Sequence, residues 1–309
     1  MSKKKGITLL VCLLIIIFAL AACGGTETAR QPREMVDREG HAITVPAEIN
    51  TIITIGPSTT EIVVGLGFAD RIISTDRFSE DVEGLPEGVS AEFGIMDFDA
   101  EFIVNLMPDI VFVTGMTRAH GEDDPMAPVS SAGITVVYMP TSVSIASIME
   151  DIRFIADVME ATEAGESIIS TMQAEIDAIA AIAANITTTR TVYFEISPAP
   201  WMFSFGSGTF LNEMIELLGA TNIFADQEGW IPVSEEALLE LNPDVILTST
   251  NFLPDPIGEI LERPGFSVIT AVQNGDVFPI DTDASNRPSH NITRALREIA
   301  EAVFPEYFR

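Results

Sequence analysis

One element occurs twice in this sequence, and it limits the fold more than any other feature. Residues 101–114 read EFIVNLMPDIVFVT and residues 236–249 read EALLELNPDVILTS. Each copy has a glutamate, six further residues, a Pro-Asp pair and an apolar run typical of a buried strand. The proline ends a short helix, and the glutamate falls in that helix's first turn, where the helix dipole favours a carboxylate. Two copies at one spacing predict two equivalent units.

The segment between the two copies has a helical pattern. Residues 151–160 carry apolar side chains at helical spacing, and residues 168–186 are rich in Ala and Ile without Gly or Pro. A helix of about 20 residues is about 30 Å long, enough to bridge two small lobes. Gly165 leaves the join between these two stretches open.

Strand-like and helix-like segments alternate on both sides of this helical segment, which indicates largely parallel sheets. The expected strands are residues 41–45, 51–55, 71–75, 110–114 and 135–139, then 191–196, 245–248 and 277–280. The sequence therefore predicts an α/β fold of two Rossmann-like α/β lobes joined by a single long helix, with a ligand cleft between them. The expected segments are a lipoprotein signal peptide (1–22), a lipidated tether (23–35), an N-terminal lobe (36–142), a helical linker (143–187) and a C-terminal lobe (188–309).

The N-terminus is typical of an exported lipoprotein. Three lysines at residues 3–5 precede a 16-residue apolar run at residues 7–22, which is short for a membrane span and suits a signal peptide. The run ends in Leu-Ala-Ala followed by Cys23 and a glycine, as in a bacterial lipobox. We expect lipidation of Cys23 and an extracytoplasmic protein whose only membrane contact is this anchor. The alternative is an uncleaved anchor helix with an incidental cysteine.

The charge distribution excludes several classes of function. No lysine follows Lys5, so the chain has no P-loop, Schiff-base or kinase-type lysine in its folded part. Loss of the three lysines changes the net charge from -30 to -33, which argues against nucleic acid or an anionic membrane surface as a partner. Cys23 is the single cysteine after the signal peptide, so neither an intrachain disulfide nor a cysteine metal site is expected.

Several short motifs together resemble one known family. They are Asp-Arg-Glu-Gly at 37–40, Pro-Ser-Thr-Thr-Glu at 57–61 with Leu-Gly at 66–67, the two repeated elements, GSGTFLNE at 206–213 and LGATNIFAD at 218–226. In this order behind a lipobox, the chain resembles the class III substrate-binding proteins of ABC importers, which serve ferric siderophores, haem and cobalamin. The resemblance runs over nearly all of the chain from about residue 36. It implies two lobes joined by one rigid helix, with the ligand in the cleft.

The resemblance also implies how the chain docks. In this family one glutamate on each lobe binds arginines of the membrane permease, and these positions fall on Glu101 and Glu236. Two exposed carboxylates make charge-assisted pairs with arginine and set the docking register. Glu235 is an alternative to Glu236, which is preferred because its spacing to Pro243 repeats that of the first copy. The expected partners are an ABC permease dimer with its ATPase, and the chain itself is expected to be a monomer.

The expected cargo is an iron(III) chelate, such as a siderophore or haem, or cobalamin. Trp230 matches an aromatic residue that lines the cleft in the vitamin B12-binding members. The equivalent position in the N-terminal lobe is Ile95, so half of that aromatic sandwich is missing unless Phe98 replaces it. No intrinsic cofactor is expected.

Ligands of open α/β sheets bind beyond the carboxyl ends of the strands. The candidate ligand-binding residues that follow expected strands or lie in loops are Ser58, Thr59, Arg77, Arg118, Trp201, Trp230 and Arg287. An arginine there would clamp a carboxylate of the cargo, and the alternative is an arginine that balances an acidic surface. The amphipathic rings of the two tryptophans favour a cleft over the core.

Metal binding and catalysis receive little support. His41, His120 and His290 are far apart in sequence, so no metal site is predicted, although His120 is a candidate ligand for haem iron. The Gly-rich turn at 206–209 fits an anion site or a capped turn equally well. An enzyme would need a nucleophile elbow, an HExxH motif or a cysteine nucleophile, and the sequence has none. We therefore expect no catalytic residues and a binding receptor, with an enzyme or a non-transport surface or adhesive lipoprotein as alternatives.

Overall fold

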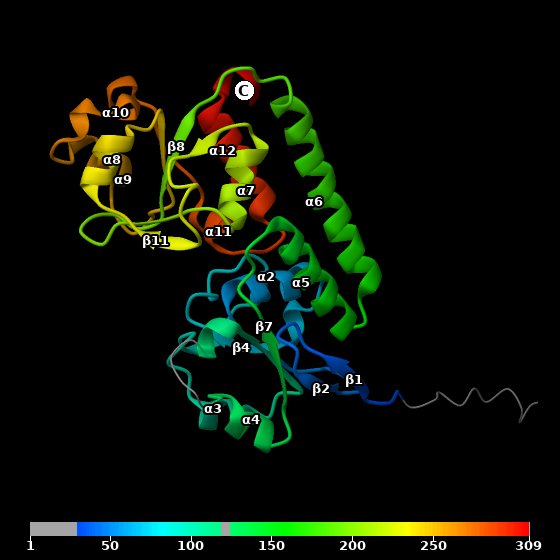
Figure 1. Cartoon of the computed structure of the whole chain (residues 1–309). Coiled ribbons are helices and arrows are strands. Elements are labelled where there is room, and N and C mark those ends of the chain that lie inside the picture. The colour runs from blue at the N-terminus through cyan, green and yellow to red at the C-terminus, as the bar shows by residue number, and fades with distance from the viewer. Residues whose placement is uncertain (1–29, 119–123, 309) are drawn as a thin grey trace, which may run out of the picture.

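The computed structural model describes residues 30–118 and 124–308, so Cys23 and His120 lie outside the described part. The N-terminal lobe is built on five parallel strands in the order β5-β4-β3-β6-β7 (Figure 1). They are β3 Ile52–Ile55, β4 Ile72–Asp76, β5 Ser90–Phe93, β6 Ile110–Thr114 and β7 Thr135–Met139. Its helices are α2 Pro57–Gly65, α3 Ala100–Leu106 and α4 Ala127–Ser131, with the 3-10 turns η1 Ala69–Arg71 and η2 Gly115–Arg118.

An antiparallel hairpin precedes this sheet. Strand β1 (Arg33–Val36) pairs with β2 (Ala42–Val45), and residues 37–40 form the turn between them. The Oδ1 atom of the buried Asp37 accepts hydrogen bonds from the N–H groups of Glu39 and His41, and Gly40 has a φ of 92°, which glycine adopts readily. In the described part of the chain, residues 33–35 of the expected tether (23–35) thus belong to strand β1.

The C-terminal lobe repeats the plan with four parallel strands in the order β10-β8-β12-β13 and a separate antiparallel pair, β9 and β11. The strands are β8 Thr191–Glu195, β9 Phe203–Phe205, β10 Thr221–Asn222, β11 Trp230–Pro232, β12 Val245–Thr248 and β13 Val277–Pro279. The helices are α7 Phe210–Leu217, α8 Glu235–Leu241, α9 Pro256–Glu262, α10 Thr270–Asn274, α11 Thr282–Asn286, α12 Ile292–Val303 and α13 Pro305–Phe308, with η3 at Phe266–Val268. The expected two α/β lobes with parallel sheets are confirmed.

Two helices connect the lobes. Helix α5 (Ile145–Val158) packs on α2 of the N-terminal lobe, whereas α6 (Thr162–Ala183) packs on α12 and α13 of the C-terminal lobe. Helix α6 runs along one side of the molecule from one lobe to the other (Figure 1). Gly165 lies inside α6, where an added Cβ would come within 2.5 Å of the Cβ of Ala156, so glycine lets α5 and α6 touch. The linker predicted as one helix is therefore a packed pair, in which α6 spans the lobes.

The same hydrogen-bonded arrangement, which we call the strand clamp, lies at the start of the central strands of both lobes. In the N-terminal lobe, Oδ2 of Asp109 accepts from the N–H of Thr51 at 2.9 Å and from its hydroxyl at 3.1 Å. In the C-terminal lobe, Oδ2 of Asp244 accepts from the N–H and the hydroxyl of Thr191, both at 2.8 Å. Each aspartate ties its own strand to the neighbouring one, which explains why the Pro-Asp pair recurs in front of β6 and β12.

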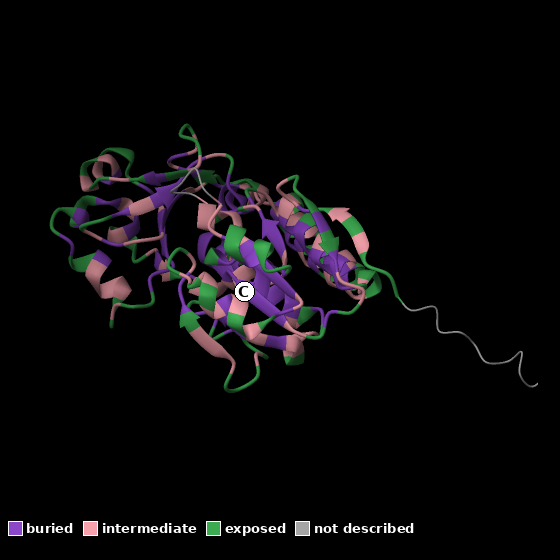
Figure 2. Cartoon of the chain, turned by 90° about the horizontal axis from the view of Figure 1, so that it is seen from below, coloured by how far each residue is buried: buried purple, intermediate pink, exposed green. Residues whose placement is uncertain are grey.

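A buried apolar core continues through both lobes and the helices that connect them. Figure 2 shows buried residues gathered in the strands and on the inner faces of the helices. Members of this core from successive parts of the chain are Phe112, Ile152, Ile176, Phe194 and Leu296. Within the described ranges, no helix is long and apolar enough to cross a membrane.

Candidate functional site

A cavity of about 460 Å³ lies between the lobes. Its N-terminal wall follows the carboxyl ends of β3, β6 and β7, as expected for parallel sheets. Its lining residues from the N-terminal lobe are Gly56, Pro57, Ser58, Ile95, Thr114, Met116, Pro140, Thr141 and Ser142, and those from the C-terminal lobe are Phe210, Trp230, Asn286, Arg287 and Pro288.

A second cavity of about 720 Å³ adjoins the first and shares five of its lining residues, Pro57, Ile95, Met116, Asn286 and Arg287. We call the two together the interlobe cleft. The residues that line only the second cavity are Arg77, Phe78, Glu80, Asp81, Met96, Asp97, Asn251, Thr282 and Asp283. The cleft is therefore apolar on one side and rich in charged groups on the other.

The apolar part of the cleft has one aromatic wall. Trp230 lies opposite Phe205 in the β9–β11 ladder, and its ring meets Phe205 and Phe210 edge-on at centroid distances of 5.9 and 6.2 Å. It remains 38% exposed, so its free surface faces the cavity. The wall from the N-terminal lobe carries Ile95 and Met116 instead of an aromatic ring. Phe98 does not replace it, because Phe98 packs against the outer core of its own lobe.

Ser142 forms part of a polar network behind the cleft. Its hydroxyl donates to Oδ2 of Asp151, and Arg38 donates to Oδ1 of the same carboxylate at 2.7 Å. Burial raises the pKa of Asp151, and the hydrogen bonds from Ser142 and Arg38 oppose that rise. Ser58 also lines the cavity and is half-buried. Thr59, by contrast, is buried in α2 and does not line the cleft.

Arg287 is the central cation of the cleft, but it is fully engaged by carboxylates. Its guanidinium lies 3.3 Å from Glu61, 2.7 Å from Asp81 and 3.0 Å from Asp283, and it donates to the carbonyl of Phe78 at 3.2 Å. Because Glu61, Asp81 and Phe78 belong to the N-terminal lobe, Arg287 bridges the two lobes. Arg287 thus lines the cleft with its charge balanced by the chain's own carboxylates, and its role as a ligand clamp stays a prediction.

Glu61, the last residue of the Pro-Ser-Thr-Thr-Glu motif, lies in α2 at the contact between the two lobes. The helix begins at Pro57 after an uncapped Gly56, so Glu61 lies further along, 5% exposed, and faces the C-terminal lobe. It accepts hydrogen bonds from Ser289 and, at 2.9 Å, from the side-chain amide of Asn291. Burial raises the pKa of Glu61, and these hydrogen bonds together with Arg287 oppose the rise.

The other two candidate arginines are also paired. Arg77 lines the cleft and lies 3.2 Å from Asp97. Arg118 lies 3.4 Å above the ring of Tyr138 and pairs with Glu39 at 3.2 Å and Asp124 at 2.9 Å. It does not line either part of the cleft, so we leave it out of the proposed site.

Trp201 is also absent from the lining of the cleft. Its side chain is 83% exposed in the bend before β9, whereas Trp230 lies in the paired strand β11. His41 donates from Nδ1 to the carboxylate of Asp37 and accepts at Nε2 from Arg118. His290 is half-buried, and its Nδ1 atom has no hydrogen-bond partner among the described residues. Among the described residues, no group of three or more His, Cys, Asp or Glu side chains is arranged to hold a metal ion.

The turn at 206–209 is a capped turn. The Thr209 hydroxyl accepts from the N–H of Asn212 at the start of α7. The N–H groups of Gly206 and Ser207 donate to the carbonyls of Gly229 and Gln227. These groups are therefore engaged by the chain itself, which favours the capped-turn alternative over an anion site.

The two candidate docking glutamates occupy equivalent places. Glu101 and Glu236 are each the second residue of a seven-residue helix, α3 or α8, and both are exposed. Both helices are capped at the N-terminus by a side chain and end at a residue in the left-handed conformation, Met107 or Asn242. Glu235 is less exposed than Glu236, so the preferred position also presents its carboxylate better.

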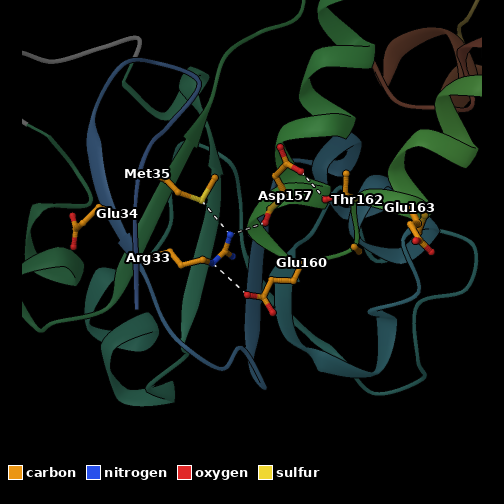
Figure 3. Close-up of a pocket in the computed structure, with 9 residues that line it drawn as sticks. Arg33, Glu34, Met35, Asp157, Glu160, Thr162 and Glu163 are labelled. Carbon is orange, nitrogen blue, oxygen red and sulfur yellow. Dashed lines mark hydrogen bonds and ion pairs between the residues drawn. The ribbon is translucent and has the colours of Figure 1, made fainter. Parts of the chain in front are cut away.

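A further cavity of about 1080 Å³ is a groove between β1 and the junction of α5 and α6. Figure 3 shows Arg33 of β1 reaching to the end of α5, where it donates to the carbonyls of Asp157 and Val158 at 3.1 and 2.7 Å. Arg33 also pairs with Glu160 at 3.4 Å. The groove shares no lining residue with the cleft, and its arginine caps the end of α5, so we do not regard it as the ligand site.

The sequence profile of the periplasmic binding proteins matches residues 52–284 of this chain. The chain belongs to the periplasmic binding protein family.

Relatives of this periplasmic binding protein match along most of their lengths. The uncharacterized ABC transporter substrate-binding lipoprotein YvrC of Bacillus subtilis is 28% identical over 324 aligned positions that cover 100% of both chains. The cobalamin-binding protein of Halobacterium salinarum is 25% identical and is covered over 72% of its length by 86% of this chain. Among solved structures, the molybdate-binding protein MolA of Haemophilus influenzae has the same fold, with a TM-score of 0.76, 23% identity, and coverage of 89% of this chain and 92% of MolA.

Proposed function

We propose that this periplasmic binding protein is the extracytoplasmic receptor of an ABC importer, and that it captures an iron chelate or a corrinoid in the interlobe cleft. The single observation that carries the proposal is a cleft between two lobes that present equivalent glutamates, Glu101 and Glu236. A cleft alone suits many binding proteins. A cleft flanked by two matched, exposed carboxylates suits a receptor that must also dock on a partner.

The apolar half of the cleft supports a large, flat or rounded cargo. Trp230 offers its free ring surface, and Ile95 and Met116 lie on the other wall. Aromatic and aliphatic walls bind the apolar faces of a macrocycle, while Ser58 and Asn286 can hydrogen-bond its polar edge. The name of the Halobacterium salinarum relative supports a corrinoid, and the Ile95 position marks the difference from a two-sided aromatic sandwich.

The docking part of the proposal rests on charge complementarity. The second residue of a helix lies in the positive field of the N-terminal turn, which stabilises Glu101 and Glu236 as carboxylates. Arginines of a permease dimer, which works with its ATPase, would form charge-assisted pairs with both and so set the orientation of the receptor. We further propose that the receptor is a monomer, anchored to the membrane through a lipid on Cys23.

Thermal unfolding of the chain from residue 24 tests ligand capture. Ferric siderophores, haem, cobalamin and free metal ions are added in turn, each in excess. A ligand at one hundred times its dissociation constant stabilises the folded state by about 2.7 kcal/mol, which shifts the melting temperature measurably. A shift with one chelate class supports the receptor. Well-folded protein that responds to none of them would favour a surface lipoprotein, and turnover of any of them would favour an enzyme.

A further inference from the structure

The charged half of the interlobe cleft has more carboxylates than guanidiniums. The carboxylates among its lining residues are Glu80, Asp81, Asp97 and Asp283. The guanidiniums are Arg77 and Arg287. The sequence has no lysine after Lys5, so no ammonium group of the folded chain adds to them.

Both arginines already have carboxylate partners from the chain itself. Arg287, whose side chain is 10% exposed, contacts Asp81 and Asp283 in the cleft and Glu61 behind it. Arg77 is half exposed and pairs with Asp97. An anionic group entering the cleft would therefore meet two cations whose charges are already balanced by carboxylates of the protein.

Glu80 adds a further negative charge at the mouth. It is exposed, and among the described residues no ion pair of Glu80 is found at 4 Å or less. An anionic ligand would meet this charge without compensation. The net charge of -33 after signal-peptide removal acts in the same direction at longer range, within the screening distance of about 8–10 Å at physiological salt.

The remaining polar groups of the cleft are neutral. Ser58, Thr114, Asn251 and Asn286 offer hydroxyl and amide groups, which suit amide or hydroxamate edges of a ligand. Trp230 supplies a π-face that attracts cations as well as apolar rings.

From this arrangement we infer that the cleft selects cargo by charge: it takes a large chelate that is neutral or cationic, with amide-like polar edges, and rejects chelates with a net negative charge. This inference rests on the proposed function, because it names the class of cargo for the same cleft. It also replaces the expectation that Arg77, Arg118 and Arg287 would clamp the carboxylates of a cargo.

Two matched pairs of ligands test the inference. Cyanocobalamin is neutral, and its hydrolysed derivatives carry carboxylates in place of side-chain amides at the same size and shape. A cationic ferric trihydroxamate and an anionic ferric triscatecholate form a second pair with the same metal. We expect a measurable dissociation constant for the neutral or cationic member of at least one pair, and binding at least about fivefold weaker for the anionic member, since one unit charge at 4 Å in water changes affinity by about that factor.

Two variants show whether the cleft carboxylates cause the discrimination. The Glu80→Gln and Asp97→Asn double variant should bind the anionic member more tightly than the unmodified chain does, while Glu262→Gln, an exposed position of α9 outside the cleft, should not. Anionic ligands that bind as tightly as their neutral partners would overturn the inference and leave the receptor proposal standing. Folded protein that binds no member of either pair, and no haem, would overturn both.

Discussion

The carboxylate of Glu61 lies 3.3 Å from the guanidinium of Arg287, and this contact joins the two lobes at the base of the cleft. Both side chains are nearly buried, with 6% and 10% of their surfaces exposed. Ser289 and Asn291 complete the hydrogen bonding of Glu61, and Asp81 and Asp283 complete that of Arg287. The base of the cleft is therefore an interlobe charge network.

Loss of this cation should destabilise the fold strongly. In Arg287→Met, Glu61 keeps its buried position without its cation, and breaking such a pair costs about 3–5 kcal/mol. Urea unfolding measures the change. Arg294→Met is the matched control, because Arg294 pairs with Asp281 at an exposed site, where about 1 kcal/mol or less is expected. Equal losses in the two variants would contradict the role of the network, and adding Glu61→Gln to Arg287→Met should recover part of the loss.

Trp230 should contribute most of the aromatic contact to the cargo. Truncation of a central aromatic anchor at a binding site costs about 2 kcal/mol, so Trp230→Ala should weaken ligand binding by about thirtyfold. Trp230→Phe should retain most of the affinity, because a ring of similar orientation remains beside Phe205 and Phe210. Titration calorimetry measures both. Trp201→Ala, at a site that is 83% exposed, should bind as the unmodified chain does.

Glu101 and Glu236 should affect transport and leave ligand binding unchanged. Glutamine at either position removes a charge from an exposed first turn and should lower stability by no more than about 1 kcal/mol. Ligand uptake is measured in cells that carry the cognate permease, alongside the dissociation constant of the purified receptor. Glu235→Gln is the control one residue away. Uptake that falls with Glu235→Gln but not with Glu236→Gln would assign docking to the neighbouring residue.

The two strand clamps should contribute similar amounts to the free energy of unfolding. Asp109→Ala leaves the N–H groups of Asn50 and Thr51 without their acceptor, and Asp244→Ala does the same to Thr191. Each should lower the free energy of unfolding by about 1–3 kcal/mol, because the lost acceptor is charged. The clamps lie in different lobes, so the double variant should show the sum within about 0.5 kcal/mol. Asp226→Ala, at an exposed position, should change stability by less than about 0.5 kcal/mol.

His290 should make stability depend on pH below its ordinary pKa. Burial lowers the pKa of its imidazole from 6.5, so the unfolded chain binds this proton at a pH where the folded chain does not. This contribution to stability is complete above pH 6.5 and is lost as the pH falls below it, by at most about 1.4 kcal/mol per pH unit. NMR titration of the ring locates the pKa, and unfolding of His290→Gln should show a shallower pH slope over this range. An unchanged slope would assign the effect to other groups.

The features that the sequence predicted well are local ones. The repeated Glu-x6-Pro-Asp pattern contains a first-turn glutamate, a helix stop and a strand within fourteen residues, so two equivalent lobes and the exposed places of Glu101 and Glu236 followed from it. The lobe order and the parallel sheets followed from the alternation of strands and helices. The sequence left the join near Gly165 open, and the structure places this glycine inside α6, where it allows close contact with α5.

The features that the sequence did not predict depend on partners far along the chain. Glu61 and Arg287 are separated by 226 residues, and nothing near either residue signals the contact. Whether an arginine is free for a ligand depends on which carboxylates surround it in space. In this acidic chain, each of the candidates Arg77, Arg118 and Arg287 pairs with at least one carboxylate. Likewise, Trp230 and Trp201 differ because only the first lies in a paired strand.

Each lobe carries one strand clamp and one short capped helix with an exposed glutamate, so the two lobes repeat the same pair of features. A permease dimer has its own two-fold axis and presents the same surface twice. If Glu101 and Glu236 dock as proposed, either lobe matches either permease subunit, so an encounter has two productive orientations instead of one. The repeated pattern that shapes each lobe would then also make a productive encounter less dependent on how the receptor approaches.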